Sequence, residues 1–298
     1  MKTTNPPADT HQLACLEVWG GSSTADHAAS VPGLDITVSS RPIEGSTAGG
    51  DLYLISSCSS GWISRMLLAD VSGHGDGVAE LSAKLRKAMH KSINVVDQSR
   101  LARMLNSAFE DISGGTKFAT ALLMTYYAPT GHLILVNAGH PPPLLCRAGS
   151  DQWTPVDKDT DGILTQKTKE LRIGVRNLPL GVIGSTHYEQ LAIKITKGDR
   201  ICAYTDGYAE AQRISGELLG VDGLASVLSE LSAGVEQDYA SQTTKAILDR
   251  GYQLAEDDHT MLSFTHNGEG MAKVGMPTLA NLIKNGFGVG HTDTVVSV

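Results

Sequence analysis

The chain has 298 residues, which is enough for one large domain or two small ones with a sizeable core. Hydrophobic residues make up 41% and charged residues 19%, a composition typical of folded globular proteins. The formal net charge is −8 and no run of lysines or arginines occurs, so nucleic acids and anionic membrane surfaces are excluded as favourable partners. Residues 1–11 lack the pattern of a signal peptide, and no segment has the apolar length of a membrane span.

Four scattered cysteines form no C-x-x-C pair. This pattern indicates reduced structural thiols and, with the absence of targeting signals, a cytoplasmic protein. The cysteines are Cys15, Cys58, Cys146 and Cys202.

The first half of the chain predicts strands followed by helices. Residues 1–30 are rich in Pro, Ser, Thr, Gly and Ala without periodicity, so we expect a flexible lead-in. Short apolar runs separated by turn residues then predict strands at 34–39, 51–57 and 63–70. Apolar residues at helical spacing predict two helices, at 78–93 and 99–112, with Asp97 or Ser99 capping the second.

The second half repeats the order of strands and then helices. A hairpin is predicted at 118–127 and 132–137, and the charged segment 148–170 is expected to cross the surface. The remaining predicted strands are 143–146, 189–195, 200–204 and 260–264, and the remaining helices are 223–231 and 236–254. This order favours an α+β fold over residues 31–266, followed by an appendage at 267–298 with a short helix at 277–284.

Four aspartates stand where an apolar, strand-like run meets a glycine-rich or polar turn. They are Asp51, Asp70, Asp206 and Asp257, and only a folded domain can bring them together. Carboxylates gathered at one place raise one another's pKa unless a cation neutralises them. Magnesium and manganese prefer oxygen ligands, so the pattern predicts a divalent cation site.

Six strings around these aspartates resemble the bacterial metal-dependent PP2C-like serine/threonine phosphatases, in particular the SpoIIE/RsbU branch. The resemblance covers residues 34–264. The strings are Gly49-Gly50-Asp51, Asp70-Val71-Ser72-Gly73-His74-Gly75, Asn137-Ala138-Gly139-His140-Pro141, Leu178-Pro179-Leu180-Gly181-Val182, Tyr204-Thr205-Asp206-Gly207 and Asp257-Asp258-His259-Thr260. The sequence departs from the family pattern at two positions: Leu54 follows Tyr53 where the family often has an aspartate nearby, and Ala69 precedes Asp70 where the family usually has glycine. Neither departure removes a proposed ligand.

The resemblance implies two packed antiparallel sheets with helices on both outer faces, and two Mn²⁺ or Mg²⁺ ions at one end. Asp51 would then contact both metals, Asp70 and the Val71 carbonyl would hold one, and Asp206 and Asp257 the other. Asp258 is an alternative to Asp257. Catalysis would run through a metal-activated water that attacks a phosphoserine or phosphothreonine, without a phosphoenzyme.

Three further residues have competing interpretations. His74 is either a proton donor to the leaving group, an orienting residue for a metal-bound water, or a structural turn residue. We interpret His140 as a loop-fixing residue rather than a metal ligand, because hard cations favour oxygen ligands. Arg41 is either a phosphate-binding group or a surface residue.

By resemblance, the substrate would be a phosphorylated anti-sigma factor antagonist of the STAS type in a partner-switching pathway. Residues 78–112 would either couple partner contacts to the metal site or merely cover a sheet. The oligomeric state is open, with a homodimer among the alternatives. The competing functions are a non-catalytic signalling module with the same fold and a hydrolase of small phosphoesters.

Overall fold

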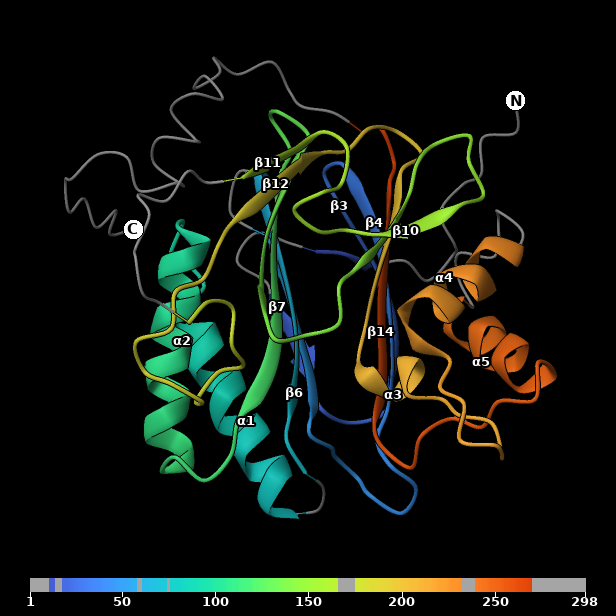
Figure 1. Ribbon diagram of the computed structural model, residues 1–298. Helices are drawn as coiled ribbons and strands as arrows, with labels where there is room; N and C mark the ends of the chain where they lie inside the picture. Colours follow the sequence, from blue (N-terminus) through green and yellow to red (C-terminus); the bar gives the residue numbers. More distant parts are fainter. Residues whose placement is uncertain are drawn as a thin grey trace.

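The apolar runs of the chain pair into two seven-stranded sheets that pack face to face (Figure 1). The computed structural model describes residues 11–13, 18–57, 61–73, 76–165, 175–231 and 239–269. In spatial order, one sheet contains β1 (His11–Gln12), β3 (Ala25–Val31), β4 (Leu34–Arg41), β14 (His259–His266), β13 (Arg200–Tyr204), β9 (Leu144–Cys146) and β10 (Trp153–Pro155). The other contains β11 (Ile163–Thr165), β12 (Leu191–Lys194), β8 (His132–Ala138), β7 (Ala119–Tyr127), β6 (Ile63–Val71), β5 (Asp51–Ser57) and β2 (Val18–Gly21).

Neighbouring strands run antiparallel, apart from the two-residue pairing of β1 with β3. Helices α1 (Asp76–Lys91) and α2 (Gln98–Ser113) cover the outer face of the β5–β8 sheet, while α4 (Gly220–Glu230) and α5 (Tyr239–Asp249) lie outside the other sheet (Figure 1). The short α3 (Asp206–Ala209) follows β13. The predicted α+β sandwich with helices on both outer faces is therefore confirmed.

Strand alternation divides the apolar residues into three layers. In β5, Tyr53 and Ile55 point between the sheets, and Leu52 and Leu54 point towards α1 and α2. A third cluster joins the opposite sheet to α4 and α5. Because β5 is buried on both faces, its residues 52–55 are all apolar rather than alternating with polar residues.

The helix pair follows the sequence prediction closely. Asp97 caps α2, since its side chain accepts a hydrogen bond from the Arg100 backbone N–H at 2.9 Å. The left-handed Gly114 ends the same helix. None of the helices in the described ranges is long and apolar enough to cross a membrane.

The predicted lead-in of residues 1–30 is wrong for its second half. Residues 18–21 form β2, paired with β5, and residues 25–31 form β3, paired with β4. These strands contain Gly, Ala and Ser, which give little apolar periodicity, and Gly20 is required because a Cβ there would lie 2.6 Å from the Tyr53 carbonyl. Residues 1–10 and 14–17, and the helix predicted at 277–284, lie outside the described residues.

The segment predicted to cross the surface at 148–170 also contains two strands. Both β10 and β11 have three residues and pair at a sheet edge, so they are too short to give a period-two pattern.

Candidate active site

Two of the predicted aspartates face each other across neighbouring strands. Asp51 is the first residue of β5, Asp70 is the next-to-last residue of β6, and the two are direct partners in the antiparallel register. Directly opposed residues have Cα atoms about 4.5–5.5 Å apart. The register of one hairpin therefore places the two carboxylates together.

The other two come from the opposite sheet, at the same end of the sandwich (the lower end in Figure 1). Asp206 begins α3 directly after β13, and Asp257 lies just before β14. Their strands are neighbours, and the Thr205 backbone N–H donates to the Thr260 carbonyl at 3.0 Å. The sandwich thus brings all four predicted positions to one end. We call this end, with Asp51, Asp70, Asp206 and Asp257, the carboxylate edge.

A buried threonine joins the two sheets at this edge. The Thr205 hydroxyl donates to Asp51 Oδ2 at 2.7 Å and accepts from the Thr260 backbone N–H at 2.9 Å. Sequence reasoning gave Thr205 no role, although it belongs to the string Tyr204-Thr205-Asp206-Gly207. The only available signal was its position next to Asp206.

Asp257 and Asp258 have different surroundings. The Asp258 carboxylate is buried and accepts hydrogen bonds from the backbone N–H groups of Ile43 (2.7 Å), Gly50 (2.5 Å) and Asp51 (3.3 Å). Asp257 is half-buried, and one of its oxygens accepts the Asp258 backbone N–H at 2.8 Å. Asp258 is therefore occupied in fixing the turn before β5.

The two glycines of this turn are required by close approach. A Cβ on Gly49 would lie 2.1 Å from a carboxylate oxygen of Asp258. A Cβ on Gly50 would lie 2.7 Å from the Val71 carbonyl oxygen and 3.3 Å from Asp70 Oδ1. The glycines thus allow the turn before Asp51 to pack directly against Asp258 and the end of β6.

The gathered carboxylates perturb one another. Burial, followed by the charges of Asp206 and Asp257, raises the pKa of Asp70 to about 7. Burial, followed by Glu210 and Asp257, raises the pKa of Asp206 to about 6. Burial and the Asp70 charge also raise the pKa of Asp51 well above its usual range, against the hydrogen bond from Thr205. Such upward shifts are expected of carboxylates that lack a compensating cation.

Glu210 is a further carboxylate at this edge, in addition to the four aspartates and Asp258. It is exposed at the end of α3 and affects the pKa of both Asp70 and Asp206. Sequence reasoning missed it, although its spacing of four residues from Asp206 is typical of one helix face.

The donor chemistry of the edge fits hard divalent cations. Carboxylate oxygens predominate, and the Val71 carbonyl lies beside Gly50 next to Asp70. Within the described part of the chain, no three acidic, histidine or cysteine side chains already surround a single point as a closed ligand set. Such a set is not needed by Mg²⁺, which keeps several waters and binds through one or two carboxylates. His74 lies outside the described residues.

The structure supports the loop-fixing interpretation of His140. Its backbone N–H donates to Asn137 Oδ1 at 2.7 Å, its carbonyl accepts from Asn137 Nδ2 at 2.7 Å, and its Nδ1 contacts the Thr120 hydroxyl at 2.8 Å. Burial lowers its pKa to about 3, so the ring is neutral at physiological pH. It acts as a structural residue of the loop after β8.

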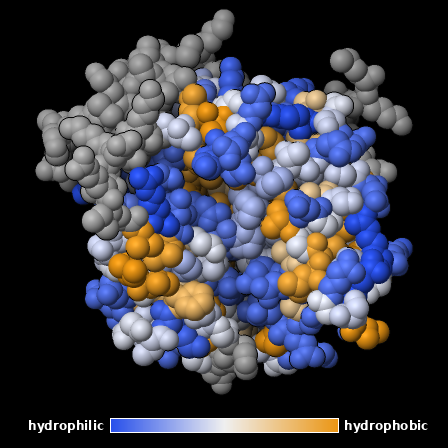
Figure 2. Space-filling model, viewed as in Figure 1, coloured by the Kyte–Doolittle hydropathy of each residue, from blue (hydrophilic) through white to orange (hydrophobic). Residues whose placement is uncertain are grey.

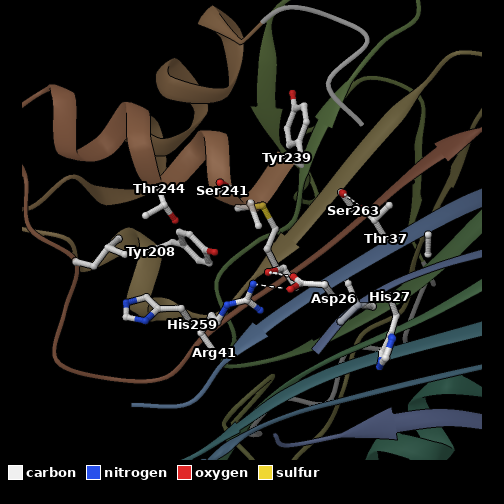
Figure 3. Close-up of a pocket in the computed structure, with 16 residues that line it drawn as sticks. Asp26, His27, Thr37, Arg41, Tyr208, Tyr239, Ser241, Thr244, His259 and Ser263 are labelled. Atoms are coloured by element: carbon white, nitrogen blue, oxygen red, sulfur yellow. Dashed lines mark hydrogen bonds and ion pairs between the residues drawn. The ribbon is translucent and has the colours of Figure 1, made fainter. Parts of the chain in front are cut away.

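Arg41 faces a cavity of about 940 Å³ between the outer face of the β3–β4–β14 sheet and α5 (Figure 3). There its guanidinium pairs with Asp26 at 2.6 Å and donates to the Ala25 carbonyl at 3.0 Å. None of the four aspartates lines this cavity, although Tyr208 and His259, two residues after Asp206 and Asp257, do. Arg41 thus pairs with Asp26 in this cavity, which none of the four aspartates lines.

Comparison with known proteins gives a consistent result. The family model described as Stage II sporulation protein E (SpoIIE) matches residues 63–267, more than half of the chain. Phosphoserine phosphatase RsbP of Bacillus subtilis is 24% identical over 147 residues, which cover 48% of this chain and 32% of RsbP. The chain thus matches about a third of the length of that relative.

Solved structures share the fold. The RsbU and RsbW domains of Rv1364c from Mycobacterium tuberculosis match with a TM-score of 0.62 and 25% identity, covering 83% of this chain and 63% of that one. RsbX in complex with magnesium matches with a TM-score of 0.57 and 16% identity, covering 81% and 99%. With the family match over most of the sandwich, these findings show that the chain belongs to the SpoIIE family of PP2C-type phosphatases, in its SpoIIE/RsbU branch.

Proposed function

We propose that this protein is a Mn²⁺- or Mg²⁺-dependent protein serine/threonine phosphatase whose substrate is a phosphorylated anti-sigma factor antagonist of the STAS type. The observation that carries the proposal is the group of four aspartates at one end of the sandwich, where the pKa values of Asp51, Asp70 and Asp206 are raised. Family membership supplies the reaction class, and the RsbP and RsbU relatives suggest a partner-switching substrate.

In this proposal two cations bind at the carboxylate edge. Asp51 would contact both, Asp70 and the Val71 carbonyl would hold one, and Asp206 and Asp257 would hold the other. Asp257 is preferred to Asp258 because Asp258 is buried and accepts hydrogen bonds from three backbone N–H groups, whereas Asp257 is half-buried and accepts one. Divalent cations at such a site supply positive charge for the phosphoryl group and acidify a coordinated water.

The protein's own residues hold this arrangement in place. Thr205 orients the Asp51 carboxylate, and Asp258 fixes the backbone on which Asp51 stands. The two cysteines in the described ranges, Cys146 and Cys202, are buried and away from the edge, so neither is placed as a nucleophile. Hydrolysis without a phosphoenzyme fits this set of side chains.

The test is phosphate release from a phosphoserine-containing STAS protein, after chelation and with Mn²⁺ or Mg²⁺ restored. We expect turnover only with added metal, and at least a hundredfold less in Asp70→Asn and Asp206→Asn. Asp249→Asn, an exposed aspartate on α5, is the matched control and retains full activity. Metal-independent turnover, or full activity of both site variants, would rule out the mechanism. A stable complex without turnover would favour a non-catalytic signalling module.

A further inference from the structure

Three large apolar side chains are exposed close together beside the candidate active site. Phe118 precedes β7, and Val182 and Ile183 lie in the loop before β12; their exposed fractions are 45%, 47% and 41%. The backbone pairing of Ala119 with Leu180 brings the two segments together. We call these three residues the 118/182 patch. Figure 2 shows apolar side chains gathered on this face, where the loop before β12 passes α2 in Figure 1.

The loop that presents the patch is firmly held by the domain. The buried Asn106 of α2 accepts from the Gly181 backbone N–H at 2.8 Å and donates to the Ile183 carbonyl at 3.0 Å. The Thr186 hydroxyl donates to the same carbonyl at 2.7 Å. Apolar side chains held outward on a braced loop lose little conformational entropy when a partner covers them, which favours an interaction surface.

The patch adjoins the loop that follows β6, two residues after Asp70. The Ser72 backbone N–H donates to the Phe118 carbonyl at 2.9 Å, and the Phe118 N–H donates to the Ser72 hydroxyl at 3.2 Å. The neighbouring Lys117 places its Nζ against Gly73, 2.5 Å from the position that a Cβ would take there. An ammonium group and an apolar surface therefore stand within a few residues of the carboxylate edge.

We propose that the 118/182 patch, together with Lys117, is the docking surface for the phosphoprotein substrate. This rests on the proposed function. A protein bound at a specific interface covers about 800 Å² of its partner. A substrate whose phosphoserine reaches the edge must therefore cover a patch that is hydrogen-bonded to the loop after β6, next to Asp70. The patch contacts apolar residues flanking the phosphoserine, and Lys117 attracts the phosphate dianion.

The charge distribution favours a phosphorylated partner over a second copy of this chain. The chain carries a formal net charge of −8, and its edge gathers six carboxylates, so another copy would bring like charges together. A phosphate dianion instead complements Lys117 and the cations proposed at the edge. A second copy is therefore an alternative outcome of the test.

The test compares a phosphoprotein with a small aryl phosphate, p-nitrophenyl phosphate, as substrates of the double variant Val182→Ser/Ile183→Ser. We expect KM and Kd for the phosphoprotein to rise at least tenfold, while hydrolysis of the aryl phosphate stays unchanged. The matched control is Ile214→Ser/Leu248→Ser, whose parent residues are also exposed but lie near α4 and on α5. Lys117→Gln should weaken phosphoprotein binding and reduce the salt dependence of that binding. Lys117→Arg keeps the positive charge and should retain the wild-type affinity and salt dependence.

Each outcome has one meaning. The proposed docking surface would be overturned if Val182→Ser/Ile183→Ser had the wild-type KM and Kd for the phosphoprotein. Equal losses of activity on the phosphoprotein and the aryl phosphate would overturn it too. A change of sedimenting mass in the double variant with substrate binding intact would identify a self-interface instead. Absence of turnover on either substrate by the wild type would refute the proposed function, while calorimetric Kd values for the phosphoprotein would still test docking. Melting curves verify that each variant is folded, and Phe118→Ser provides a second binding variant.

Discussion

At the scale of single residues, the clearest distinction is between two adjacent carboxylates before β14. Asp258 satisfies three backbone N–H groups and is buried, whereas Asp257 accepts one and is half-buried. The same residue type therefore has two tasks: one carboxylate holds the turn before β5, and the other is available to a cation.

This distinction predicts that alanine at Asp258 mainly lowers stability, whereas alanine at Asp257 mainly weakens metal binding. Asp258→Ala leaves buried backbone donors unpaired and should lower the free energy of unfolding by about 3 kcal/mol. Asp257→Ala should change the metal-free stability by no more than about 1 kcal/mol and weaken divalent-cation binding at least tenfold. Urea unfolding and calorimetric metal titration measure the two quantities. Equal loss of stability in both variants would contradict the assignment.

His140 predicts a pH dependence of stability. Burial lowers the folded-state pKa of His140 to about 3 from an ordinary value of 6.5. Between these two pH values the histidine is protonated in the unfolded chain and neutral in the folded protein. The free energy of unfolding of the wild type relative to His140→Gln should therefore fall by up to about 1.4 kcal/mol per pH unit from pH 6.5 down to about pH 4. Denaturant unfolding at several pH values measures this; a constant difference would contradict it.

At the scale of elements, α1 is bonded directly to the turn before Asp51. The buried Ser82 hydroxyl lies 2.9 Å from the Gly50 carbonyl and 3.0 Å from the Val78 carbonyl, and it donates towards both. The Gly50 carbonyl also accepts from the Val71 backbone N–H at 3.2 Å. A shift of α1 would thus move the backbone on both sides of the Asp51–Asp70 pair, which favours coupling over mere covering of the sheet.

Ser82→Ala should therefore affect the metal requirement more than stability. The Gly50 carbonyl keeps its bond from Val71 and alanine favours helix, so the free energy of unfolding should change by less than about 1 kcal/mol. The metal concentration for half-maximal activity should rise severalfold. Ser107→Ala, at an exposed serine of α2, is the control. An unchanged metal requirement in Ser82→Ala would show that α1 only covers the sheet.

At the scale of the whole molecule, the two sheets meet at an edge that is electrostatically unfavourable without cations. The bonds of Thr205 and Asp258 hold the sheets together there, against mutual repulsion of the carboxylates. Metal binding should therefore act on global stability as well as on activity.

Chelation should lower the melting temperature, and Mg²⁺ or Mn²⁺ at a hundred times its Kd should add about 2.7 kcal/mol per independent site. In metal-free protein at pH 8, Asp70→Asn should be more stable than the wild type, because the pKa of Asp70 is raised to about 7 and its ionised form is disfavoured in the fold. The same variant should lose most of the metal response. Calorimetric scans with and without metal measure both effects; a destabilised metal-free Asp70→Asn with a full metal response would contradict this account.

The sequence predicted most elements because their patterns are local. The apolar spacing of α1 and α2, the Asp97 cap and the apolar run at 52–55 in β5 follow from propensity and periodicity. The sequence did not predict β2 and β3, because their small residues give no apolar periodicity. These segments form strands because they pair with β5 and β4. Edge strands β10 and β11 were missed for the same reason: pairing, not local preference, makes them strands.

By itself, the sequence predicted that four aspartates gather at one site, since each stands at a strand–turn boundary, and the order of motifs indicated the family. Only the tertiary structure distinguished the surroundings of Asp257 from those of Asp258. The roles of Asp258, Thr205 and Glu210 depend on groups from the opposite sheet or a neighbouring element, up to 215 residues away in the chain. Such contacts leave no local pattern, because burial and hydrogen-bond partners exist only once both sheets have packed.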